Sequence, residues 1–160
     1  MTSSSVSARL LLVDDHRMGL AARRPVLQEL GYEVETCTLS DHALAALGER
    51  EFHLLITDYK LPDGNGQTLI AKARKKHTGL KVILLSGYAD ALGLHENNTG
   101  ADVVIQKSAN EVSVLVRAVK KLLKPSRRTA ASAPKPAGEK PEKKPMSRVA
   151  PSVQKTQKKR

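Results

Sequence analysis

The sequence has few of the residues that mark secreted or membrane proteins. It holds one cysteine, no tryptophan, one phenylalanine and three tyrosines among 160 residues. A single cysteine excludes an internal disulfide and is typical of a reducing cytosol. No apolar stretch approaches the about 20 residues that a transmembrane helix needs. Residues 1–7 also lack the basic and apolar regions of a signal peptide. We therefore expect a cytoplasmic protein without a transmembrane segment.

Charge divides the chain into two parts. Residues 1–124 carry 16 Lys/Arg and 14 Asp/Glu, whereas residues 125–160 carry 11 and 2 and hold six of the eight prolines. The second part has no aromatic residue and few large aliphatic ones, which predicts a disordered Lys/Pro/Ala-rich tail. Such a tail is equally consistent with a plain solvated segment and with salt-sensitive contact to a polyanion such as DNA or RNA. We expect residues 1–8 to be flexible as well.

Five strand-like stretches, four of which are short apolar runs, alternate with helix-like segments and predict an α/β domain. The expected strands are 9–13, 33–37, 53–57, 81–85 and 103–106, and the expected helices are 17–30, 40–49, 66–77, 90–97 and 110–123. Continuous apolar strands are typical of a parallel sheet that is covered on both faces. Strict alternation of strand and helix indicates one doubly wound sheet with right-handed crossovers. Pro25 falls inside the first helix, where we expect a bend or a pause.

Polar residues follow these apolar runs at the points where the strands end. They are Asp14 and Asp15 after the first run, Asp58 after Leu54-Leu55-Ile56-Thr57, Ser86 after Val82-Ile83-Leu84-Leu85, and Lys107 after Val103-Val104-Ile105-Gln106. Because the carboxyl ends of parallel strands meet at one edge of the sheet, these side chains are expected to share a pocket.

The residue types in this pocket suit phosphoryl chemistry. Clustered carboxylates repel one another, and a hard divalent cation such as Mg²⁺ relieves that repulsion through oxygen ligands. Asp58 stands alone after its strand and is the expected nucleophile, since a carboxylate can carry a phosphoryl group. Asp14 and Asp15 would hold the metal. Lys107 would stabilise the phosphoryl oxygens, and Ser86 would donate a hydrogen bond to one of them.

Taken together and in order, these motifs resemble the receiver domain of two-component response regulators. The motifs are the pair Asp14-Asp15, Asp58 followed by Leu61-Pro62-Asp63-Gly64-Asn65-Gly66, Ser86-Gly87, and Gly100-Ala101-Asp102 leading to Lys107. The resemblance covers residues 9–124 and implies a flavodoxin-like five-stranded parallel sheet in the order 2-1-3-4-5. Residues 125–160 are too few and too polar to form a conventional output domain, so we expect none in this tail.

The resemblance also implies a mechanism and partners. Asp58 would accept a phosphoryl group from a sensor histidine kinase or a histidine phosphotransfer protein. Mg²⁺ would be bound by Asp14, Asp15, Asp58 and the backbone carbonyl of Lys60. The chain would then be no enzyme toward other substrates, because it would catalyse only its own phosphorylation and dephosphorylation.

The sequence departs from the family's pattern on one side of the domain. Val104 stands where the family usually carries Tyr or Phe, and Ser108 stands where it usually carries Pro. The expected helix 90–97 is rich in poor helix formers. We hypothesise that the chemistry is intact while the signal leaves by another route. That route is either an order change in residues 87–100 or transfer of the phosphoryl group to another protein.

Two alternatives remain open from the residues. One is a haloacid-dehalogenase-type phosphatase, which also uses Asp, Ser/Thr and Lys on a parallel sheet but places its nucleophile after the first strand. The other is a non-specific nucleic-acid-binding protein that acts through residues 125–160 and is regulated by the receiver. His16, directly after the acids, is read as a first-turn helix residue near the pocket rather than as a ligand.

Overall fold

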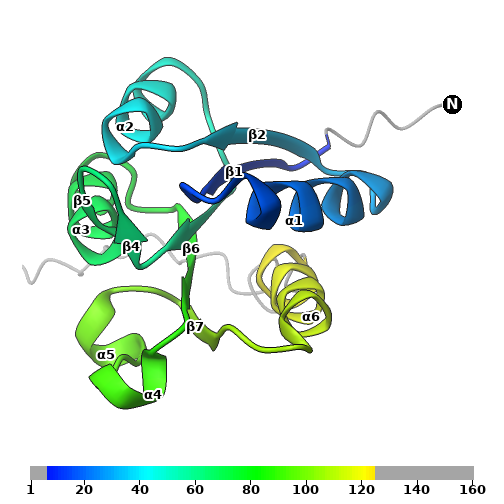
Figure 1. Ribbon diagram of the computed structural model, residues 1–160. Coiled ribbons are helices and arrows are strands. Elements are labelled where there is room, and N and C mark those ends of the chain that lie inside the picture. Colours follow the sequence, from blue (N-terminus) through cyan, green and yellow to red (C-terminus); the bar gives the residue numbers. More distant parts are fainter. Residues whose placement is uncertain (1–6, 125–160) are drawn as a thin grey trace, which may run out of the picture. The chain divides into compact units, whose positions relative to one another are not determined.

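The computed structural model describes residues 7–124 as one α/β unit (Figure 1). The expected basic tail and most of the expected flexible N-terminus lie outside the described residues. Within residues 7–124, no helix is long and apolar enough to span a membrane.

Five parallel strands form the sheet that carries the site. They are β1 (Arg9–Val13), β2 (Glu33–Cys37), β3 (Leu54–Asp58), β6 (Lys81–Ser86) and β7 (Val103–Gln106). Their order is β2-β1-β3-β6-β7 and every neighbouring pair is parallel, which confirms the expected doubly wound sheet. The order places the end of β3 between the ends of β1 and β6.

Helices cover both faces of the sheet, as the continuous apolar strands predict (Figure 1). Helices α1 (Arg17–Glu29) and α6 (Glu111–Leu123) pack on one face, where Leu27 and Leu115 join Leu12 and Ile56. Helices α2 (Ser40–Glu49) and α3 (Gly66–Lys76) pack on the other. Because successive side chains of a strand point to opposite faces, each central strand contributes to both cores.

The structure corrects the expected helix 90–97. Two single-turn helices stand there, α4 (Ala89–Leu92) and α5 (Glu96–Thr99). Gly93 lies between them with φ of 62° and ends α4, because its left-handed conformation turns the chain back and lets the Leu94 N–H donate to the Ala89 carbonyl at 2.8 Å. Asn98 then caps α5 by accepting a hydrogen bond from the His95 N–H. One glycine thus divides the segment that the pattern had predicted as continuous.

Two further features concern a helix and a loop next to the site. Helix α1 continues through Pro25, so of the expected bend or pause the pause is absent. The loop after β3 contains an unpredicted two-residue hairpin, β4 (Lys60–Leu61) paired antiparallel with β5 (Gly64–Asn65). At the end of this hairpin Gly66 is required by close packing, because a Cβ there would collide with the backbone oxygen of Asp58.

The same hairpin caps α2. The Asp63 carboxylate accepts hydrogen bonds of 3.0 Å from the backbone N–H groups of Ser40 and Asp41, and these two bonds lower its pKa to about 2. Helix α2 has no cap from its own N-terminal residue Leu39, so a residue from another loop supplies it.

Asp63→Ala is expected to lower stability at neutral pH and to remove part of its acid dependence. A depressed folded-state pKa gives stabilisation that is complete above the unfolded value and is lost as pH falls toward about 2. Urea unfolding at pH values between about 5 and 2 should therefore show a shallower pH dependence in the variant than in the wild type. Asp41→Ala is the matched control, because it removes an acid from the first turn of α2 and keeps both backbone hydrogen bonds to Asp63. Parallel curves for Asp63→Ala and wild type would contradict this role.

Candidate phosphorylation and metal site

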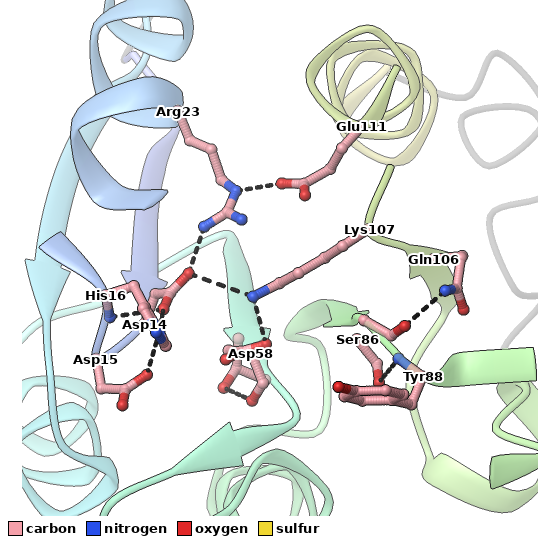
Figure 2. Close-up of polar contacts among 12 residues, drawn as sticks. Asp14, Asp15, His16, Arg23, Asp58, Ser86, Tyr88, Gln106, Lys107 and Glu111 are labelled. Carbon is pink, nitrogen blue, oxygen red and sulfur yellow. Dashed lines mark hydrogen bonds and ion pairs between the residues drawn. The ribbon is translucent and has the colours of Figure 1, made fainter. Parts of the chain in front are cut away.

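Three carboxylates meet where β1 and β3 end (Figure 2). One ligand atom each from Asp14, Asp15, Asp58 and His16 lies within 4.8 Å of the others. Asp14 and Asp58 are buried, whereas Asp15 and His16 are exposed. The expected convergence of the first and third strand ends is therefore present, and His16 joins it as the residue that directly precedes α1.

Lys107 points from the end of β7 into this cluster (Figure 2). Its Nζ lies 2.8 Å from Asp58 Oδ1 and 3.7 Å from Asp14 Oδ2. Burial raises the pKa of Asp58, and the neighbouring Asp14 adds to the rise, while the hydrogen bond and charge of Lys107 offset part of it. Asp58 is thus a buried carboxylate whose charge is balanced in part by one neighbouring cation.

Asp14 is the most enclosed acid of the cluster. Its Oδ1 accepts a 2.8 Å hydrogen bond from the His16 N–H, and its Oδ2 accepts one of 2.5 Å from Arg23 Nη1. Burial alone raises the pKa of Asp14, but the His16 N–H, Arg23 and Lys107 together outweigh burial and lower it. Asp14 is therefore ionised and fixed in orientation.

The donor set of the cluster fits a hard divalent cation. Asp14, Asp15 and Asp58 each present a carboxylate oxygen to one small volume, and Asp15 faces water. Such a set suits Mg²⁺, which is bound through one or two carboxylates and keeps several water ligands. Coordination by His16 is less favourable, because its Nδ1 lies 3.0 Å from Asp15 Oδ1 and is engaged there.

Comparison with known proteins decides the family. The family model of the response regulator receiver domain, which describes the sequences of that family, matches residues 10–120. The chain belongs to this family.

Relatives of this receiver domain include kinases and regulators. A stretch of 91 residues is 34% identical to the sensor kinase CckA of Brucella abortus, and it covers 56% of this chain and 10% of that protein. The chain spans only 10–20% of the length of the first curated relatives it matches.

Solved structures match over the whole receiver domain. The response regulator TrrA of Thermotoga maritima, in complex with Mg²⁺ and BeF, is 33% identical with a TM-score of 0.66. That match covers 72% of this chain and 99% of the other. The structure of TrrA bound to the histidine kinase ThkA matches with a TM-score of 0.65 at the same identity, over 72% of this chain and 98% of the other.

Two further predicted site residues of the receiver domain, Ser86 and Lys60, both contact Tyr88. Ser86 is buried at the end of β6, and its hydroxyl oxygen accepts a 3.1 Å hydrogen bond from the Tyr88 N–H (Figure 2). Lys60 lies two residues after Asp58 in β4, with its Nζ 5.3 Å from the centre of the Tyr88 ring. This cation–π contact spans the loops that follow β3 and β6.

Val104 is half-buried in β7 and does not reach the cluster. It packs against the core on the α2–α3 face, and its N–H donates to Glu96 at 3.3 Å. Gln106, which the sequence analysis did not single out, instead joins β7 to the loop after Ser86. Its amide nitrogen donates to the Gly87 carbonyl at 2.7 Å and its amide oxygen accepts from the Asp90 N–H at 3.1 Å.

The sequence analysis also missed Arg23 and Glu111. Arg23 is buried in α1 and bridges Asp14 to Glu111 at the start of α6, with 2.5 Å on each side. The signal for both was periodicity: Arg23 lies on the helix face of Leu20 and Leu27, and Glu111 lies on the face of Leu115. A charged residue at a core position of an amphipathic helix indicates a buried partner.

Proposed function

We propose that this receiver domain is a phosphoacceptor in a two-component phosphorelay and that Asp58 is the residue that carries the phosphoryl group. The observation that supports this most is the environment of Asp58. It is a buried carboxylate at the end of β3, with Lys107 Nζ at 2.8 Å and two further acids beside it. The proposed unit comprises residues 9–124.

Each remaining site residue has a role in this proposal. Asp14, Asp15, Asp58 and the backbone carbonyl of Lys60 would hold Mg²⁺, which would supply positive charge beside the acceptor carboxylate. Lys107 stabilises the oxygens of that group, because its ammonium lies against the acceptor carboxylate. Ser86 donates its hydroxyl hydrogen to a phosphoryl oxygen, which leaves its existing bond from Tyr88 in place because an oxygen can accept and donate together.

The proposed donor is a phosphohistidine of a sensor histidine kinase or of a histidine phosphotransfer protein. An Asp58 oxygen forms the new O–P bond, the N–P bond breaks, and the imidazole nitrogen keeps the electron pair. The complex of the related TrrA with the kinase ThkA supports this class of partner. The reaction turns over no other substrate, so we class the chain as a signalling protein. None of the described residues favours the alternative phosphatase or a nucleic-acid-binding role.

The test is intact mass spectrometry of the wild-type chain after incubation with acetyl phosphate, with Mg²⁺ or with EDTA. We expect one phosphoryl group per chain with Mg²⁺ and none with EDTA, since the three acids repel an anionic donor without the metal. Hydroxylamine should remove the group, because it cleaves acyl phosphates and spares phosphoserine. An adduct that survives hydroxylamine, or no adduct under either condition, would contradict the proposal.

A further inference from the structure

Arg23 is a buried cation that belongs to the site but comes from the middle of α1. It is 4% exposed, and both of its acidic partners, Asp14 and Glu111, are also buried. Its Nη1 donates to Asp14 Oδ2 and its Nε donates to Glu111 Oε1 (Figure 2). One guanidinium thus connects the end of β1 with the first residue of α6.

The space for this guanidinium is provided by a glycine one turn earlier in α1. A Cβ at Gly19 would lie 2.6 Å from Asp14 Oδ2 and 2.7 Å from Arg23 Nη1. Those distances are shorter than carbon–oxygen and carbon–nitrogen contacts allow, so any side chain at this position would displace the ion pair. Gly19, Arg23 and Glu111 therefore form one packing arrangement around Asp14.

One carboxylate oxygen of Asp14, Oδ2, lies close to two cations. Its Oδ2 is 2.5 Å from Arg23 Nη1 and 3.7 Å from Lys107 Nζ, and its Oδ1 already accepts the His16 N–H. A carboxylate has about four acceptor positions, of which the hydrogen bonds from His16 and Arg23 use two, while Lys107 at 3.7 Å acts only through its charge. Asp14 therefore keeps acceptor capacity for a metal ion, and Arg23 is an additional positive charge against which that ion must bind.

We propose that Arg23 is a positioning residue that sets the Mg²⁺ affinity of the site, and that Glu111 adjusts this effect by taking up part of the Arg23 charge. This proposal rests on the metal site of the proposed function, not on the phosphorylation of Asp58. Arg23 fixes Asp14 and repels the metal. Glu111 draws the guanidinium toward α6 and so weakens that repulsion.

The arrangement links the metal site to α6. Binding free energies are reciprocal, so if Glu111 changes the Mg²⁺ affinity, Mg²⁺ changes the strength of the Arg23–Glu111 pair by the same factor. The first turn of α6 therefore responds to occupancy of the site through a chain of direct contacts. This route avoids β7, where Val104 replaces an aromatic residue.

The experiment measures Mg²⁺ binding by isothermal titration calorimetry on the full chain at fixed ionic strength. Glu111→Gln keeps the shape and the hydrogen bond but removes the negative charge, so we expect Mg²⁺ to bind about threefold to tenfold more weakly than to the wild type. Arg23→Met/Glu111→Met removes both charges and frees Asp14, so Mg²⁺ should bind about tenfold more tightly. The net charge of the chain is unchanged in this double variant.

The matched control is Arg24→Met/Glu29→Met, which makes the same replacements at exposed positions of α1 and should leave Mg²⁺ binding within about twofold of wild type. If the pair had only a structural role, the Mg²⁺ affinities of Glu111→Gln and of the double variant would shift in the same direction from that of the wild type. That result, or equal affinities, or a wild type that binds no Mg²⁺, would overturn the proposal. If circular dichroism shows that the double variant is unfolded, the near-isosteric Glu111→Gln decides alone. If the chain is not phosphorylated but the Mg²⁺ affinities still fall from the double variant to the wild type to Glu111→Gln, only the proposed function is contradicted.

Discussion

Asp58→Asn is expected to take up no phosphoryl group from acetyl phosphate under conditions that label the wild type completely. The amide has the shape of the carboxylate, but its oxygen is neutral and a poor nucleophile, so the loss is total rather than partial. The substitution also removes one of the buried negative charges beside Asp14. We therefore expect folding stability to stay within about 1 kcal/mol of wild type, because burial raises the pKa of Asp58 and so opposes its charge.

The measurement is intact mass with peptide mapping, together with urea unfolding of the same preparation. Asp63→Asn is the matched control, because it changes an acid of the neighbouring hairpin whose carboxylate contacts α2 and not the cluster. It should be labelled like the wild type. A phosphoryl group mapped to Ser86 or His16 in Asp58→Asn would assign the acceptor elsewhere in the cluster. Loss of labelling together with unfolding would leave the assignment unsupported.

The sheet and the acid cluster were predictable from the sequence for the same physical reason. Buried parallel strands read as short apolar runs, and the residue that follows each run falls at one edge of the sheet. Asp14, Asp58 and Lys107 therefore converge although they lie far apart in the chain. The pattern carries this information because the ends of β1, β3, β6 and β7 are each marked by a change from apolar to polar residues.

Other features depend on contacts that no local pattern encodes. Gly93 divides the segment expected as helix 90–97, since its positive φ ends α4 where the weak propensities of the flanking residues cannot continue it. The cap that Asp63 gives to α2 comes from another loop, so the helix itself carries no sign of it. Pro25 was expected to bend α1 or to make it pause, and the helix continues through it because packing against the sheet and α6 outweighs the loss of one hydrogen bond.

Arg23→Met alone is expected to lower the free energy of unfolding by about 3–5 kcal/mol, which is the cost of leaving buried charges without their partner. Asp14 would keep Lys107 at 3.7 Å, but Glu111 would lose the guanidinium that lies 2.5 Å away in the wild type. A loss of this size is a large fraction of the total stability of a domain this small. Urea unfolding followed by circular dichroism measures it directly.

The companion variant Arg23→Met/Glu111→Met should recover part of that loss, because it also removes the Glu111 charge and leaves only Asp14, which keeps Lys107 and the His16 N–H as partners. A double-mutant cycle with Glu111→Met then gives the coupling between the two residues, which we expect to be well above 1 kcal/mol for buried groups in direct contact. Additive effects would mean that the pair contributes no mutual stabilisation. In that case the retention of two charges at core positions of α1 and α6 would have no structural reason. A large coupling, in contrast, makes Arg23 and Glu111 a single unit, and the contact of Arg23 with Asp14 connects that unit to the end of β1.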